Sequence, residues 1–391
     1  MDELKEWRRR GERSLAAAAP TLVLFTLQRL VAISAMRWVG GPDWMTSIAL
    51  RYDAGWYLGI VTAGYDDFPR VDASGSIVRT NLAFFPLYPG IATAVHRLLP
   101  VSPELALLIV AWVSSLIAAG GLFLIGRHLG GPAAGMALAL LWGASPQSIV
   151  LVMGYSESLA SALLVLALYA LLRDRPLAAA FATALAGLSR PTATALVAIV
   201  GLWLVVQILR KARDRESVAH PWWVLLVSLL LTPTGLAAVL GFVAHKTGSL
   251  LGYFQVQGQW NMVMGSPLGA LRLMARALFP VGEDASLAAV YVPVLAGYLA
   301  LLVIVAGWLF PRVRTGYGWL AAYTVLGAGL ALTNQSYFHS IARHLMGVVT
   351  LLLPLLDLKT RRWSVALVLV AASVATSWWG ANLVAQGHFS P

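Results

Sequence analysis

Long apolar runs separated by short polar connections dominate the sequence. A helix needs about 20 apolar residues to cross the hydrocarbon core of a membrane, so these runs predict membrane-spanning helices. A helix also satisfies its backbone hydrogen bonds within its own segment, as lipid requires. We therefore predict an all-α polytopic membrane protein, a bundle of about 11 transmembrane helices, near residues 15–37, 103–126, 133–151, 155–172, 176–189, 191–210, 222–245, 287–310, 317–333, 341–357 and 363–383.

Two longer segments, 38–102 and 246–286, interrupt this pattern. The first is polar and rich in Asp and Gly, and it contains two short helical candidates at about 53–62 and 86–99. We expect these to be juxtamembrane amphipathic helices that lie in the interface, because neither is long enough to span comfortably. We find no internal repeat and no separate soluble domain. Residues 1–391 are therefore predicted to form a single membrane domain, with residues 1–14 as a lead-in to the first span.

Composition and charge agree with this class. The chain is 59% hydrophobic and 12% charged, with a mean hydropathy of +0.75, whereas about a quarter of the residues of a soluble domain are charged. The net charge of +11 does not indicate nucleic-acid binding, because the basic residues cluster in connections between apolar runs. The absence of cysteine excludes disulfides and thiolate metal sites.

The distribution of Lys and Arg predicts the topology. They concentrate in the lead-in and in alternate connections, such as RHLGGP, RDRP and RKARDRESVAHP. The positive-inside rule places these segments and the N-terminus in the cytoplasm, and it places both long loops on the extracytoplasmic side. We expect a multi-pass protein of a plasma or inner membrane.

The stretch RYDAGWYLGIVTAGY, residues 51–65, sets a carboxylate among aromatic residues beside the predicted membrane surface. Asp53 could deprotonate a hydroxyl that attacks an activated sugar, while Trp56 and Tyr57 could stack on sugar faces. The alternative is that Asp53 caps a helix beginning at Ala54, a position that favours Asp. The spacing alone favours the cap.

Three further acids, Asp66, Asp67 and Asp72, follow this stretch. Adjacent carboxylates can bind a divalent cation through oxygen. No His or further acid joins them at a suitable spacing, so we favour a solvated acidic turn and predict no metal site.

Two charged residues lie within or beside the predicted spans. Glu157, in MGYSESLAS, is energetically unfavourable so near hydrocarbon and is a functional candidate; alternatively, it belongs to the capped first turn of a helix after Ser156. Arg190 precedes a proline, which disfavours helix at that position. At such a helix break it could bind a lipid phosphate bidentately, or it could snorkel to the surface.

Two polar segments complete the candidates. In NQSYFHSIARHL, His339 and Arg343 are four residues apart and would share one helix face. Arg343 and Arg190 together could supply positive charge to a departing phosphate, although a surface His is more often a solvated or packed residue. In GSLLGYFQVQGQWN, Gln257 and Trp260 suit sugar hydroxyls, or simply a polar loop at an interface.

Six motifs in order give these pieces a family resemblance. They are RYDAGWYLGIVTAGY, NLAFFPLYPG, GYSESLASALLVLALYAL, LAGLSRPTATAL, GSLLGYFQVQGQW and HSIARHLMGVVTLLLPL. Over about residues 50–355 they resemble the PIG-V-type mannosyltransferases of the GT-C superfamily, and the Arg/Ala-rich usage suggests a bacterial member. The chain departs from that pattern in having His344 for Tyr, Ala193 for Gly and Ser249 for Asp.

The resemblance implies an inverting transfer of mannose from polyprenyl-phosphate-mannose to a hydroxyl of a lipid-linked or cell-surface acceptor, on the extracytoplasmic side. It implies Asp53 as the catalytic base, and a donor phosphate bound by Arg190, Arg343 and His344. Expected substrate contacts are Arg51, Trp56, Tyr57, Asp66, Glu157, Gln257, Trp260 and His339. No cofactor is implied with certainty, and a divalent cation is not favoured. The implied partners are the donor, the acceptor and membrane lipids, and no nucleic acid.

Two alternatives stay open. A transporter or lipid flippase would need charged residues along a central path and commonly has repeated halves. Here the polar candidates gather on the predicted outer side, which favours an enzyme that works at one surface. A catalytically inactive GT-C relative would carry the same motifs, and an activity assay would distinguish it.

Overall fold

The protein is described by a computed structural model over residues 2–75, 77–214, 216, 218–260, 265–266, 269, 272, 294, 297–302, 304, 317–333, 338–357 and 362–386. For residues 2–15, 338–339, 357, 362–366 and 386 only the backbone is described. Almost all of this part of the chain is helical, and the one β-bridge within it joins Val71 to Ile77.

The bundle helices are α1 (Asp2–Gly40), α5 (Pro103–Gly130), α6 (Pro132–Gly143), α7 (Glu157–Leu172), α8 (Pro176–Gly187), α9 (Thr194–Arg213), α10 (Trp222–Leu231), α11 (Thr234–Thr247), α15 (Gly318–Leu332) and α17 (Arg362–Gln386). The other helices are α2 (Trp44–Leu50), α3 (Asp53–Ala63), α4 (Leu87–Leu98), α12 (Gly252–Gln259) and α16 (Phe338–Met346). Short 3₁₀ segments are η1 (Gly41–Asp43), η2 (Asn81–Ala83), η3 (Ser148–Leu151), η4 (Pro191–Ala193) and η6 (Val349–Asp357).

Five helical segments of the described chain are long and apolar enough to cross a membrane: Ala16–Leu50, Pro103–Gly130, Pro191–Arg213, Trp222–Thr247 and Leu367–Ala385. Four shorter apolar helices, α6, α7, α8 and α15, accompany them. The predicted class is confirmed: the chain is an all-α integral membrane protein. The predicted number of spans is not confirmed.

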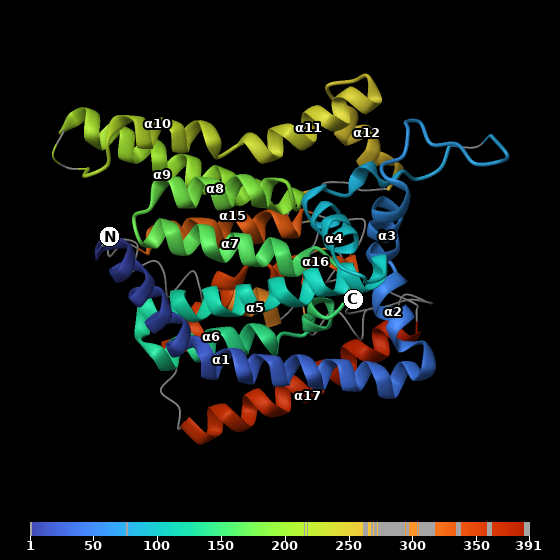
Figure 1. Cartoon of the computed structure of the whole chain (residues 1–391), viewed down its shortest axis with the longest axis horizontal. Coiled ribbons are helices and arrows are strands. Elements are labelled where there is room, and N and C mark those ends of the chain that lie inside the picture. Colours follow the sequence, from blue (N-terminus) through green and yellow to red (C-terminus); the bar gives the residue numbers. More distant parts are fainter. Residues whose placement is uncertain are drawn as a thin grey trace.

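The bundle helices lie side by side, and the other helices gather at one end of the bundle (Figure 1). This end carries α2, α3, α4, α12 and α16, and we call it the site end. The N-terminus lies toward the other end, as do the connections α5–α6, α7–α8 and α9–α10 (Figure 1). Basic residues close the helices there, including Arg127 on α5 and Arg210 on α9. The two groups of segments that the charge pattern separates thus lie at opposite ends.

Small residues let the central helices approach closely. A Cβ atom on Gly126 of α5 would lie 2.7 Å from the carbonyl oxygen of Ala134 on α6. Such contacts are typical of helices that associate in lipid, where dispersion contacts between closely packed backbones replace the hydrophobic effect. They fix the bundle helices as a scaffold for the site end.

Three predicted spans are interrupted. The run 133–151 is α6 followed by a turn and η3, and the run 222–245 is divided between α10 and α11 at Pro233. The run 341–357 is not one helix, because α16 ends at Met346 and a 3₁₀ segment containing Pro354 follows. Proline cannot donate a helical hydrogen bond and clashes with the preceding turn, which explains the break at Pro233. In the run 341–357 the break falls at Gly347 and Val348, before the 3₁₀ segment that contains Pro354.

The loop 38–102 contains the two predicted helices, since α3 covers Asp53–Ala63 and α4 covers Leu87–Leu98. Of the two, α4 has a clear apolar face and α3 does not, so the amphipathic description fits α4 alone. The sequence did not predict α2. The predicted span 287–310 lies largely outside the described residues, as does most of the loop after residue 260.

Candidate active site

Four charged side chains from four separate segments meet at the site end of the bundle. Arg343 of α16 lies 3.0 Å from a carboxylate oxygen of Asp53, the first residue of α3. Its Nε atom lies 3.2 Å from Oε1 of Glu157, the first residue of α7. Arg190, between α8 and η4, reaches the same Glu157 oxygen at 2.6 Å. Two guanidinium groups and two carboxylates therefore form one connected cluster.

The cluster is largely shielded from solvent. The side chains of Glu157 and Arg343 are 7% and 8% exposed, and that of Arg190 is 13% exposed. Asp53 is the most accessible, at 27%. Charges so deeply buried must be paired to be tolerated, and the most accessible member is a carboxylate that a small solute could reach.

Asp53 does not cap a helix. The helix α3 begins at Asp53 itself, its N-cap residue is Tyr52, and no side-chain capping bond forms there. Tyr52 has φ +56° and ψ −125°, outside the regions that L-residues favour. Strain of this kind persists only where the surrounding structure holds it, and it often marks functional sites. The capping alternative is therefore wrong, and the carboxylate is committed to Arg343.

Glu157 was alternatively predicted to belong to a capped first helical turn, and Arg190 to snorkel to the surface. The structure shows a different arrangement for both. Ser156 is the N-cap residue of α7, yet its hydroxyl makes no capping bond. It instead accepts hydrogen bonds from Tyr57 at 2.7 Å and from Arg190 at 3.2 Å. Arg190 has extended backbone at the break before Pro191, as predicted, but its side chain points to Glu157. It is a member of the buried network and not a snorkelling anchor.

The segment before Glu157 is held against the start of α3. The backbone N–H of Gly154 donates to the carbonyl oxygen of Ile48 in α2 at 2.9 Å. A Cβ atom on Gly154 would lie 3.3 Å from the Cβ of Ala54, so the missing side chain permits the close approach. This contact places the residues just before Glu157 against the first turn of α3, which begins with Asp53.

A buried arginine in α1 is hydrogen-bonded to the chain between α6 and η3, which leads to Glu157. Arg29 of α1 donates to the carbonyl oxygen of Ser148, at 2.7 Å, and to that of Gly143. These carbonyls flank the turn between α6 and η3. Arg29 thus satisfies backbone groups that the interrupted helix leaves without a helical partner.

A small cavity of about 50 Å³ adjoins the cluster. Glu157, Arg190, Thr192, Arg343 and His344 supply its polar wall. Its remaining wall is mostly small or apolar, formed by Ala160, Ser161, Leu164, Ala186, Ala193, Leu196, Tyr323, Gly327, Ala331, Gly347 and Val348. Cationic groups beside an apolar lining suit a phosphate attached to a hydrocarbon chain.

Aromatic side chains from three segments, one of them α3, pack against one another. Trp56 stacks on Phe84 at a ring-centroid distance of 6.0 Å and meets the edge of Trp260 at 4.8 Å. Trp260 follows α12, and its indole N–H donates to the carbonyl oxygen of Thr80 at 3.0 Å. Tyr57 lies deeper, with its ring against Phe84. The predicted residues Trp56, Tyr57 and Trp260 are thus brought together, with Phe84 among them.

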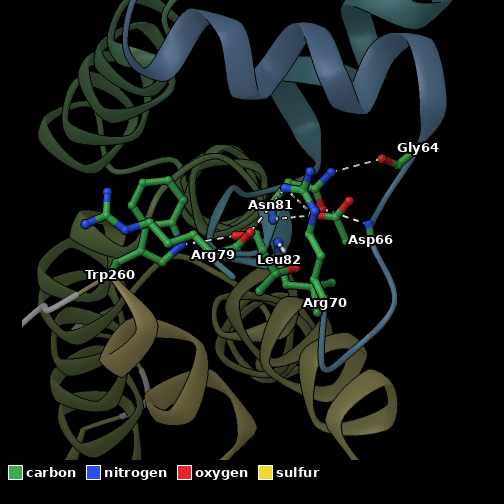
Figure 2. A network of polar contacts seen from close by, with 8 residues as sticks. Gly64, Asp66, Arg70, Arg79, Asn81, Leu82 and Trp260 are labelled. Carbon is green, nitrogen blue, oxygen red and sulfur yellow. Dashed lines mark hydrogen bonds and ion pairs between the residues drawn. The ribbon is translucent and has the colours of Figure 1, made fainter. Parts of the chain in front are cut away.

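Asp66, Asp67 and Asp72 of the acidic turn each contact a different partner. Asp66 accepts from the backbone N–H of Asn81 at 2.8 Å, and Asn81 accepts from the N–H of Asp66 at 2.8 Å (Figure 2). Asp67 pairs with Lys246, and Asp72 accepts from Ser74. Within the described residues, no group of three His, Cys, Asp or Glu is placed to hold a metal ion. Asp66 organises a loop and is not in the charged cluster.

Three other candidates lie elsewhere. Arg51 donates to the carbonyl oxygens of Val384 and Ala385 near the end of α17, where a cation is favourable. Gln257 of α12 is hydrogen-bonded to Tyr253. The side chain of His339 lies outside the described part of the chain. For these three, contact with a substrate remains a prediction.

The sequence did not single out several residues of the site end. Ser156 was predicted only as part of a helix cap, and no role was predicted for Phe84. No role was predicted either for Arg70 and Arg79, whose guanidinium groups lie over the rings of Trp56 and Trp260. Their signal was an arginine on each side of an acidic, glycine-containing turn between aromatic motifs.

No protein-family model matches the sequence, and no curated protein does. Solved structures do resemble the fold. ArnT from Cupriavidus metallidurans bound to undecaprenyl phosphate matches with a TM-score of 0.52 and 12% identity, over 93% of this chain and 75% of ArnT. The Archaeoglobus fulgidus oligosaccharyltransferase in its apo form matches with a TM-score of 0.52 and 14% identity, over 93% of this chain and 56% of that enzyme. These likenesses show that the chain shares the fold of these two membrane proteins.

Proposed function

We propose that the protein is an inverting glycosyltransferase. It transfers mannose from a polyprenyl-phosphate-mannose donor to a hydroxyl of a lipid-linked or cell-surface acceptor on the extracytoplasmic side. The observation that carries the proposal is the cluster in which Arg343 joins Asp53 to Glu157 while Arg190 binds the same Glu157. It places one accessible acid beside two cations, at one end of a bundle whose fold is of the GT-C type.

Asp53 serves as the base in this proposal. Its carboxylate accepts the proton of the acceptor hydroxyl as the hydroxyl oxygen attacks the anomeric carbon of the sugar. The bond from that carbon to the phosphate oxygen breaks, and its electron pair leaves with the polyprenyl phosphate. Attack opposite the leaving group inverts the anomeric centre, and one base suffices for this geometry.

Arg190 and Arg343 stabilise the charge that develops on the leaving phosphate. Guanidinium groups bind phosphate through parallel hydrogen bonds, and a shielded site strengthens that interaction. Both side chains line the cavity, together with His344 and Thr192. The structurally similar ArnT has been captured with undecaprenyl phosphate, which supports a polyprenyl phosphate as the carrier.

The choice of mannose rests on the sequence resemblance. The aromatic group formed by Trp56, Phe84 and Trp260 supports a sugar substrate in general, because aromatic rings present apolar faces on which sugar rings can pack. The polar cluster lies at one end of the bundle and not along a central path, which favours surface chemistry over transport.

The test uses the full chain, purified in lipid nanodiscs, with radiolabelled polyprenyl-phosphate-mannose and a total extract of cell-surface lipids as acceptor. We expect release of polyprenyl phosphate and a labelled product, and neither from the Asp53→Asn variant. Polyprenyl-phosphate-glucose is tested in the same assay, and the ratio of the two transfer rates measures the preference for mannose. Near-normal transfer by Asp53→Asn, or no consumption of either donor by the unaltered protein, would overturn the proposal.

A further inference from the structure

A solvent-facing groove of about 730 Å³ lies beside the aromatic group. Trp56, Arg70, Asp72, Ile77, Val78, Arg79 and Gln259 line it. Its volume falls within the range of roughly 300–1,000 Å³ of small-molecule sites. It is distinct from the cavity beside Glu157, because no residue lines both.

Two arginines flank this groove, and each lies over an indole. The guanidinium carbon of Arg70 is 5.7 Å from the ring centroid of Trp56, and that of Arg79 is 5.3 Å from the centroid of Trp260. The two indoles contact each other edge to face at 4.8 Å. A stacked guanidinium keeps its N–H groups at the edge of its plane, so it can still donate to an oxyanion.

Two guanidinium groups, those of Arg70 and Arg79, and one carboxylate, that of Asp72, line the groove, so its lining has a net positive charge. Arg70 is 3.6 Å from Asp66, whose carboxylate also accepts a shorter bond from the backbone of Asn81. The carboxylate of Asp72 accepts from the Ser74 hydroxyl at 2.6 Å. Between the carboxylates and the guanidinium of Arg79, no ion pair forms within the described residues.

The backbone around both arginines is fixed. The Asn81 amide donates to the carbonyl oxygen of Gly64 at 3.0 Å, in addition to its paired bonds with Asp66 (Figure 2). Arg70 donates to the carbonyl oxygen of Arg79 at 3.1 Å, which ties the two limbs of the loop together. A site that is organised before binding loses little free energy in ordering when a ligand arrives.

We propose that this groove binds a carbohydrate that carries an oxyanion, a phosphate or a carboxylate, with Arg70 and Arg79 on the anion and the indoles on the sugar. Trp56 follows Asp53 by three residues in α3, so both lie on one side of that helix. If the proposed function holds, the ligand is the acceptor, and its anion anchors it while a hydroxyl reaches Asp53. A neutral acceptor would supply no anion to the guanidinium of Arg79.

Binding is measured on the full chain in zwitterionic nanodiscs, with mannose 6-phosphate, glucuronic acid, methyl mannoside and inorganic phosphate as probes. At low salt we expect one or both anionic sugars to bind at least about tenfold tighter than methyl mannoside, because charge-assisted hydrogen bonds add to the sugar contacts. The two anionic sugars distinguish phosphate from carboxylate. Equal affinity for the neutral sugar, or inorganic phosphate binding as tightly as the anionic sugars, would overturn the proposal.

The variants test which side chains are responsible. Arg79→Gln and the double variant Arg70→Gln/Arg79→Gln should lose the preference for anionic sugars, whereas Arg97→Gln, an exposed arginine at the end of α4, should keep it. Arg79→Lys, which keeps the charge, should retain part of it, and thermal unfolding checks that each variant is folded. An unchanged preference in the double variant would overturn the proposal. So would variants that lose binding to anionic-lipid vesicles while keeping their affinity for the sugars.

Donor consumption separates this inference from the proposed function. Slow transfer to water needs no acceptor, so Arg79→Gln should keep that reaction while its KM for an anionic acceptor rises. If the unaltered protein binds anionic sugars but consumes no donor, the proposed function is wrong and the proposal for the groove is supported. Should it consume donor and show no preference for anionic sugars, the groove proposal fails and the proposed function stands.

Discussion

The guanidinium of Arg343 lies between the carboxylates of Asp53 and Glu157, 3.0 Å from one and 3.2 Å from the other. One cation is thereby shared by two acids that come from distant parts of the chain. Because Arg190 also binds Glu157, a change at any of the four side chains alters the electrostatic balance of the others. The consequences for activity and for stability can be measured separately.

Removing the charge of Asp53 should abolish transfer with little effect on the fold. Asp53→Asn keeps the shape of the side chain but cannot accept the proton, and general base catalysis contributes about 10²–10⁴-fold in rate. The measurement is product formation in nanodiscs, with thermal unfolding in parallel. Asp67→Asn is the matched control, because that acid of the same loop is 97% exposed and pairs only at the surface with Lys246. Equal losses in the two variants would contradict the assignment.

Removing Arg343 should destabilise the protein through the acids that it leaves behind. Breaking a buried ion pair by deleting one partner costs about 3–5 kcal/mol, so Arg343→Gln should lower the unfolding temperature markedly. Adding Asp53→Asn should restore part of the loss, because Asp53 is the acid that loses its cation, whereas Glu157 keeps Arg190. The unfolding temperatures of the single and double variants measure this coupling. Strictly additive losses would show that the shared contact contributes nothing.

The Ser156 hydroxyl should matter more than its tyrosine partner. Ser156→Ala leaves a buried Tyr57 hydroxyl without its acceptor, and such an unsatisfied group costs about 1–3 kcal/mol. Tyr57→Phe removes the donor instead and should cost only about 0.5–1.5 kcal/mol. Ser156→Ala should also raise the KM for the donor, because Arg190 loses a contact that holds it. The reverse order of destabilisation would contradict this view of the network.

Filling the space at Gly154 should impair transfer without touching a charged residue. In Gly154→Val the new side chain presses on Ala54 and pushes the start of α7 away from the start of α3. A misplacement of about 1 Å can reduce a rate by up to about 10²-fold, so we expect a lower kcat. Gly201→Val is the control, because a Cβ atom at Gly201 of α9 meets no other atom within 4 Å. Unchanged transfer in Gly154→Val would show that this contact does not position the acids.

Much of the fold was predictable because lipid restricts the backbone so strongly. Apolar runs such as 103–126 could only be helices, and α3 and α4 were placed almost to the residue. The prediction for the run 341–357 was wrong, because its hydropathy is that of a span while α16 ends at Met346 and a 3₁₀ segment follows. Apolar character alone therefore predicts that a segment is buried better than it predicts that the segment is one uninterrupted helix.

The four charged residues of the cluster were each predicted as candidates, but their arrangement was not predictable. Glu157 and Arg190 were singled out because charge near hydrocarbon is unfavourable without a partner, and each is the other's partner. Their pairing with Arg343 depends on how α7, α8 and α16 meet, which no local pattern contains. Arg70 and Arg79 went unnoticed because exposed loop arginines are common, and only the folded loop places them over indoles.

The charge balance of the cluster has a consequence for turnover. With two guanidinium groups already paired to two carboxylates, a lipid phosphate that enters must compete with Glu157 and Asp53 for the same N–H donors. Under the proposed function, Glu157 and Asp53 form their ion pairs with the two arginines again after the sugar has been transferred. These ion pairs then displace the polyprenyl phosphate from the site. Product inhibition by polyprenyl phosphate should accordingly be weak, and it should strengthen when Glu157 is replaced by Gln.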